Sequence, residues 1–140
     1  MTMEERVEKA IELFKSGYNC AQAVFAAFAD QYGIDKETAL KLSSSFGGGV
    51  GGMREVCGAV CGMSMVAGLK TGMTVAKDLE QKKTNYNLVQ KLANKFKEEN
   101  GSIVCKQLLG LEPGIDSEKK KKPCVEYVRK CAELLVSMEE

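Results

Sequence analysis

Four of the six cysteines in this sequence stand where a helix is expected to begin. They are Cys20, Cys57, Cys105 and Cys124. The N-terminus of a helix presents unpaired N–H groups and the positive end of the helix dipole, and both favour a thiolate over a thiol. Since the thiolate is the form that attacks disulfides and binds metals, this placement indicates sulfur chemistry, without establishing which kind.

Composition narrows the setting of that chemistry. The chain has 140 residues, 44% of them hydrophobic, so we expect one domain spanning residues 1–140 with a core that needs no disulfide staples. The first residues lack the apolar core of a secretory signal and no apolar run is long enough to cross a bilayer, which predicts a cytoplasmic protein without membrane insertion. Permanent disulfides are rare in the reducing cytoplasm, so six cysteines point to catalysis, redox cycling or metal binding. A net charge of +1 predicts no nucleic-acid partner.

The sequence contains no histidine. This absence excludes Cys–His nucleophile pairs, mixed Cys/His zinc sites and haem attached through a Cys-x-x-Cys-His motif. If the cysteines have a chemical role, the remaining hypotheses are those in which cysteine itself holds a metal or exchanges electrons.

The elements that must position these cysteines are helices. Apolar residues recur at helical spacing along the whole chain and no strand-like alternation competes, which predicts an all-α fold: a single antiparallel bundle of about five to seven helices. The last segment before the final helix, residues 112–122, is charged and is expected to be an exposed linker. The helices are expected over residues 3–14, 20–32, 35–42, 57–69, 74–99, 102–109 and from 123 onward.

Residues 46–52 interrupt this helical pattern with five glycines and are predicted to form a loop. They contain Gly-x-Gly-x-x-Gly, but no strand precedes the pattern and the phosphate-loop lysine is missing, so nucleotide binding is not predicted. We expect instead that Gly48 and Gly49, with Gly58, bring N–H groups close to sulfur as a support around a cofactor. Arg54 either adds positive charge there or is an exposed surface charge, and the sequence leaves both interpretations open.

Cys61 and Cys131 lie on apolar helix faces, and whether they take part in the chemistry stays open. Cys61 is four residues after Cys57, whereas redox dithiols normally use the tighter Cys-x-x-Cys spacing. A free cysteine also packs well as a small hydrophobic residue, which would explain both positions.

The chain resembles the bacterial and archaeal redox-active protein family named for a Cys-Gly-Ala-x-x-Gly motif and additional separated cysteines. The motif stands at residues 57–62, and the likeness spans nearly the whole chain. The other matching segments are 17–24 with Cys20, 46–49 with the glycines, 101–110 with Cys105, and 124–128 with Cys124. The resemblance implies an α-helical redox protein that uses Cys20, Cys57, Cys105 and Cys124. Some relatives carry an iron–sulfur centre, and for this chain the same four cysteines are then the candidate metal ligands.

Three functions remain open from the sequence, so it does not decide between an oxidoreductase and an electron carrier. The first is an electron-transfer protein whose four cysteines ligate an iron–sulfur cluster or another metal. The second is a metal-free thiol–disulfide oxidoreductase, in which Cys57 attacks and Cys20 is its partner. Either of these needs a redox partner, which the sequence does not identify. The third is a structural zinc site or a non-redox interaction protein that forms a homodimer through the helix predicted over residues 74–99.

Overall fold

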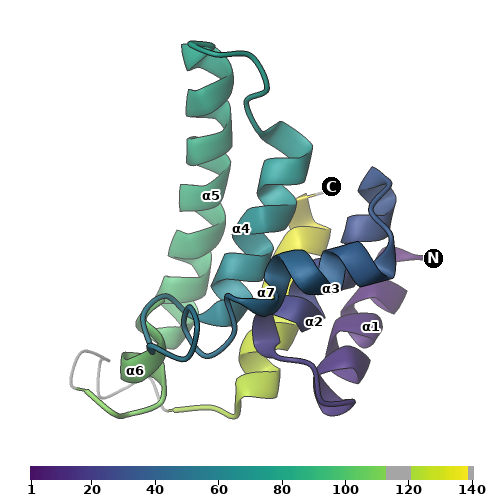
Figure 1. The fold of residues 1–140 in the computed structure, drawn as a ribbon. Helices are drawn as coiled ribbons and strands as arrows, with labels where there is room; N and C mark the ends of the chain where they lie inside the picture. The colour runs from purple at the N-terminus through teal and green to yellow at the C-terminus, as the bar shows by residue number, and fades with distance from the viewer. Residues whose placement is uncertain (113–120, 139–140) are drawn as a thin grey trace.

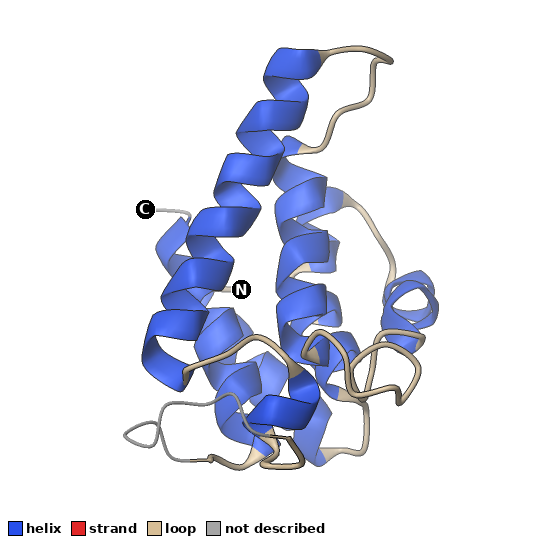
Figure 2. Cartoon of the chain, turned by 90° about the vertical axis from the view of Figure 1, so that its left-hand side faces the viewer, coloured by secondary structure: helices blue, strands red, loops and turns tan. Residues whose placement is uncertain are grey.

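The structure, a computed structural model, describes residues 1–112 and 121–138 (Figure 1). Within these residues the only regular elements are helices, apart from one antiparallel bridge between Val56 and Val104 (Figure 2). The all-α prediction is confirmed, and most of the predicted linker 112–122 lies outside the described residues. None of the described helices is both long and apolar enough to cross a membrane. The elements are α1 (Met3–Lys15), α2 (Cys20–Ala26), the 3-10 helix η1 (Ala29–Tyr32), α3 (Lys36–Ser44), α4 (Gly58–Thr71), α5 (Leu79–Asn100), α6 (Cys105–Leu108) and α7 (Cys124–Met138).

Helix α4 runs through the middle of the bundle and packs against α2, α5 and α7 (Figure 1). Its Val66 and Met63 are fully buried, as is Phe96 of α5. Burying side chains of this size contributes roughly 1.5–3 kcal/mol each. Helices α2, α4 and α7 all begin at the same end of the bundle, the lower end in Figure 1. This shared polarity brings their first residues together although the residues are far apart in the sequence.

The start of α2 is fixed by a capping box. Asn19 accepts a hydrogen bond from the Gln22 N–H at 2.9 Å, and the Gln22 side chain accepts one from the Asn19 N–H at 3.0 Å. The same two side chains donate to backbone carbonyls of α3, at Ser44 and Leu40. Since a cap of this kind contributes about 1 kcal/mol and here also ties two helices together, it holds Cys20 in a defined place.

The helix expected over residues 20–32 is divided in the structure. Helix α2 ends at Ala26 and η1 begins at Ala29. The Ala27 carbonyl accepts a hydrogen bond from the buried guanidinium of Arg6 at 3.0 Å, and Arg6 also pairs with Asp30 at 2.5 Å. In a continuous helix this carbonyl would accept a backbone hydrogen bond, and here Arg6 is its partner instead. The periodicity of apolar residues in the sequence gives no sign of this contact.

Two other predicted helix starts are also shifted. Helix α5 begins at Leu79, where the Asp78 side chain caps it, and not at residue 74. Helix α6 begins at Cys105, because the Ser102 hydroxyl accepts from the Val104 N–H and closes a turn before the helix. In α5, Leu92 and Phe96 are buried, whereas Leu79 and Tyr86 near the start of the helix are 72% and 53% exposed. Dimer formation through this helix stays a prediction.

Two glycines of α4 provide a matched test of the packing between α2 and α4. A Cβ atom at Gly62 would lie 2.7 Å from the Ala21 carbonyl oxygen, whereas one at Gly68 would meet nothing within 4 Å. We expect Gly62→Ala to lower the free energy of unfolding by about 1–3 kcal/mol and Gly68→Ala to raise it by roughly 0.5–1 kcal/mol, measured by urea denaturation. Equal effects of the two substitutions would contradict this packing.

Candidate functional site

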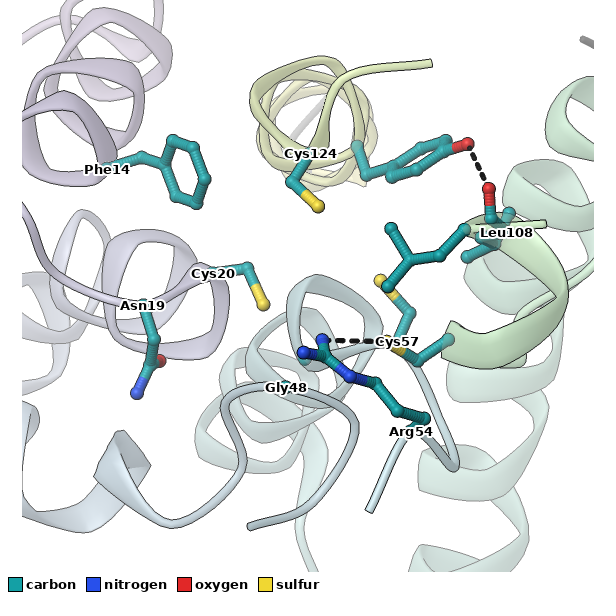
Figure 3. Close-up of a pocket in the computed structure, with 12 residues that line it drawn as sticks. Phe14, Asn19, Cys20, Gly48, Arg54, Cys57, Leu108 and Cys124 are labelled. Carbon is teal, nitrogen blue, oxygen red and sulfur yellow. Dashed lines mark hydrogen bonds between the residues drawn. The ribbon is translucent and has the colours of Figure 1, made fainter. Parts of the chain in front are cut away.

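A cavity of about 190 Å³ opens at the end of the bundle where α2, α4 and α7 begin. All four cysteines singled out from the sequence line it, and Figure 3 shows Cys20, Cys57 and Cys124 around one common space. Cys61 and Cys131 are not among the residues that line it. The other lining residues are Phe14, Asn19, Gly48, Arg54, Gly58, Leu108, Leu109 and Tyr127.

Cys20 reaches the cavity because Gly58 has no side chain. A Cβ atom at Gly58 would overlap the Cys20 sulfur and would lie 2.9 Å from the Phe46 carbonyl oxygen. The first turn of α4 can therefore approach the first turn of α2 directly. Glycine at this position brings the Cys20 and Cys57 segments together.

Backbone hydrogen bonds join the segment that carries Cys57 to the segment that carries Cys105. The Cys57 N–H donates to the Ile103 carbonyl at 2.7 Å, and the Cys105 N–H donates to the Glu55 carbonyl at 2.5 Å. These two bonds flank the bridge between Val56 and Val104. Residues 48 positions apart in the sequence are thus held side by side by a piece of β-type pairing in an otherwise helical protein.

Tyr127 links the segments that carry Cys105 and Cys124. Its hydroxyl donates to the Leu108 carbonyl at the end of α6 at 3.3 Å and accepts from the Lys122 N–H just before α7 at 3.1 Å. The Lys122 ammonium donates in turn to Asn100 at 2.9 Å. The start of α7, and with it Cys124, is therefore anchored to both α5 and α6.

The glycine loop predicted over residues 46–52 curls beside the cavity (Figure 3). Gly48 lines the cavity and Gly49 is buried, where its missing Cβ would lie 2.7 Å from both the Arg54 Cα and the Cys105 Cβ. The guanidinium of Arg54 donates to the Cys105 sulfur at 3.8 Å. Both interpretations of Arg54 hold: the residue is exposed, and its guanidinium also lines the cavity and brings positive charge to the site.

Burial raises the pKa of several of these thiols. The pKa of Cys57 rises to about 12, first because the residue is desolvated and then because Cys20 lies nearby, while the amides of Ala59 and Val60 act in the opposite direction. The pKa of Cys124 is also raised, by burial and by Cys20 and Cys105, against the opposing charges of Arg54 and Lys121. At these two thiols burial acts against the thiolate that a helix N-terminus favours, and it is the largest cause of the raised pKa.

The two remaining cysteines lie in less polar places. The pKa of Cys61 is raised to about 11, chiefly by burial, and its sulfur donates to the Val56 carbonyl at 3.8 Å. Cys131 is fully buried in the core, and burial raises its pKa well above the ordinary range. Packing as a small hydrophobic residue accounts for Cys131, which belongs to the hydrophobic core, whereas Cys61 is half-buried.

All six cysteines are free thiols. Within residues 1–112 and 121–138, no three Cys, Asp or Glu side chains are arranged so that they could hold a metal ion. The four cysteines at the cavity are thus gathered around a common space but are not arranged around one point. The donor types match those of an iron–sulfur cluster, which is held by four cysteine thiolates.

Sequence reasoning did not identify the apolar part of the cavity wall. Apolar residues at helical spacing look the same in a sequence whether they line a core or a cavity. The sequence pattern therefore does not distinguish the apolar residues of the cavity wall, which are Phe14, Leu108, Leu109 and Tyr127. Asn19 was identified only as a helix cap. No local signal in the sequence separates these roles.

These features define an all-helical protein with a cavity lined by four cysteines from distant parts of the chain. The chain belongs to the family described as "Putative redox-active protein (C_GCAxxG_C_C)", whose sequence model matches residues 18–138. The proposed resemblance is therefore confirmed, and all four cysteines fall within the matched range. No curated protein and no solved structure matches the chain.

The raised pKa of Cys57 predicts a pH dependence of stability in the metal-free, reduced protein. The folded state holds this proton more tightly than the unfolded state, so its stabilising contribution is present below about pH 9 and is lost as the pH rises toward 12. We expect the free energy of unfolding of the wild type to fall more steeply with pH than that of Cys57→Ala, by up to about 1.4 kcal/mol per pH unit. Urea denaturation between pH 8 and 11 measures this, and parallel curves for the two proteins would contradict it.

Proposed function

We propose that this chain is an electron-transfer protein in which Cys20, Cys57, Cys105 and Cys124 ligate an iron–sulfur cluster. One observation carries the proposal: these four cysteines, and neither of the other two, line the same cavity. They come from four different helices and lie up to 104 residues apart. Packing alone gives no reason for four sulfurs to gather in one place.

A cluster needs less convergence of its four donors than a single ion does. Four thiolates on one zinc ion, with bonds of about 2.3 Å, must approach one another to about 3.8 Å. The four thiolates of a [4Fe–4S] cluster each bind a different iron and stay farther apart. When bound, such a cluster takes up and releases single electrons. Sulfurs that surround a cavity without converging on a point fit the second requirement better.

The surroundings of the sulfurs also suit a buried, negatively charged group. The helix dipoles of α4 and α7 direct their positive ends toward the cavity, and Arg54 adds a full positive charge. Leu108, Leu109 and Phe14 limit the access of water. The raised pKa of Cys57 means that this thiol gives up its proton only when a cation takes its place, which is the usual coupling of metal binding to proton release.

A metal-free thiol–disulfide oxidoreductase is the second candidate, favoured by the partial exposure of Cys20 and Cys124. In such a reaction two thiols form a disulfide, and two electrons and two protons pass to the disulfide of a partner. Cys57, which the sequence suggested as the attacking thiol, is 5% exposed and has a pKa of about 12, so it is poorly suited to that role. We rank this function second for that reason.

Both functions require a redox partner protein, and both suit a cytoplasmic location, where free thiols persist. These two features belong to the proposal together with the cluster.

Anaerobic purification followed by a visible spectrum and by iron, sulfide and zinc analysis tests the proposed function. We expect a coloured protein with iron and sulfide in equal amounts, bleached by dithionite. Single Cys→Ala substitutions at positions 20, 57, 105 and 124 should each lower the cluster content severalfold. Cys61→Ala and Cys131→Ala are the matched controls and should keep it, since neither residue lines the cavity.

Three other outcomes would each overturn the cluster proposal. Colourless protein with one zinc per chain would identify a structural zinc site. Metal-free protein whose titratable thiols fall by two on oxidation would identify dithiol exchange. Metal-free protein whose thiols do not cycle would leave a non-redox helical protein.

A further inference from the structure

Arg54 is the one charged side chain among the described residues that line the cysteine cavity. Its Nη1 atom donates a hydrogen bond to the Cys105 sulfur at 3.8 Å. A dashed line marks a hydrogen bond from Arg54 in Figure 3. We propose that Arg54 is a positioning residue whose charge stabilises the negative charge of the sulfur site and thereby sets its reduction potential. The inference rests on the proposed function, because it concerns the redox property of the same site.

The backbone before Arg54 is shaped to deliver this side chain. Residues 48–52 all have positive φ angles, between 58° and 79°, so the chain turns in the left-handed sense over five consecutive residues. The coil is closed by hydrogen bonds from the Arg54 N–H to the Gly48 carbonyl and from the Glu55 N–H to the Gly49 carbonyl, each at 2.9 Å. The Arg54 carbonyl accepts from the Lys106 N–H at 3.0 Å, which fixes Arg54 beside Cys105 from the other side.

Arg54 itself has a φ angle of 61°, in the left-handed region. This conformation costs a residue with a Cβ atom about 1 kcal/mol or more, and glycine would adopt it freely, as it does at neighbouring positions. Here an arginine occupies the position although the backbone favours glycine. The contact between its guanidinium and the Cys105 sulfur gives the side chain a role that glycine cannot fill.

None of the nearby lysines that the structure describes lines the cavity, Lys121 included. The Lys106 ammonium is shared between the carboxylates of Glu55 at 3.6 Å and Glu112 at 3.4 Å, and the Lys122 ammonium donates to Asn100. The Arg54 guanidinium and Cys124 line the same cavity, so the charge of Arg54 faces the site beyond its direct contact with Cys105.

A positive charge at the site stabilises its more negative state. The reduced form of a cluster carries one more negative charge than the oxidised form, and thiolates carry more negative charge than the disulfide that they form. In either case, loss of the Arg54 charge makes reduction less favourable and moves the reduction potential to more negative values.

Anaerobic redox titration with dithionite compares the wild type with Arg54→Gln, Arg54→Lys and Arg129→Gln. We expect Arg54→Gln to change the reduction equilibrium about tenfold, a negative shift of about 59 mV for one electron. Arg54→Lys keeps the charge and should shift less. Arg129→Gln removes an equal charge from the surface of α7, where Arg129 pairs with Glu126, and should leave the potential unchanged. If Arg54 had a purely structural role, the reduction potential would not depend on the charge of the residue at position 54 in this way. Equal potentials of the wild type and Arg54→Gln would overturn the inference.

A second measurement uses the metal-free, reduced protein and does not depend on the cluster. Iodoacetamide alkylation at fixed pH, with each cysteine followed by mass spectrometry, should modify Cys105 severalfold more slowly in Arg54→Gln than in Arg54→Lys or the wild type. If the wild type shows no redox transition, the proposed function fails. The alkylation rate then decides the role of Arg54 alone, and an unchanged rate would overturn it.

Discussion

The central physical constraint in this structure is the desolvation of thiols at the N-terminal ends of helices, where Cys57 and Cys105 are buried and Cys20 and Cys124 are half-buried. Burial disfavours the thiolate and raises the pKa of Cys57 to about 12, whereas the helix dipoles and Arg54 favour it. In the metal-free protein burial is the largest cause of the raised pKa of Cys57 and Cys124. In the function proposed above, a bound metal would take the place of the proton at these two thiols.

The cysteines are brought together by contacts other than the hydrogen bonds within the helices. The backbone pairing of Val56 with Val104 holds Cys57 beside Cys105, the missing side chain of Gly58 admits the Cys20 sulfur, and the Tyr127 hydroxyl anchors the start of α7. Each contact joins segments that are distant in the sequence. The helical bundle provides a rigid frame, and these contacts select which residues face the cavity.

Much of the fold could be predicted from the sequence, because helical periodicity, capping residues and terminal glycines are local signals. The starts of α1, α2 and α3 and the identity of the four cysteines at the cavity follow from such signals. The break after Ala26 could not be predicted, since it depends on a hydrogen bond from Arg6. The late start of α5 could not be predicted either, since the helix is capped at Asp78 although an apolar residue at helical spacing comes earlier in the sequence. Likewise, the dipole argument predicted thiolates, and only the three-dimensional structure shows the burial of the sulfurs that acts against them.

X-ray absorption at the iron edge of the anaerobically purified protein tests the central claim most directly. The account predicts iron coordinated only by sulfur, with other iron atoms as near neighbours, because four cysteines and bridging sulfides would be the ligands. Iron coordinated by oxygen or nitrogen without iron neighbours, or a purified protein that contains no iron, would contradict it.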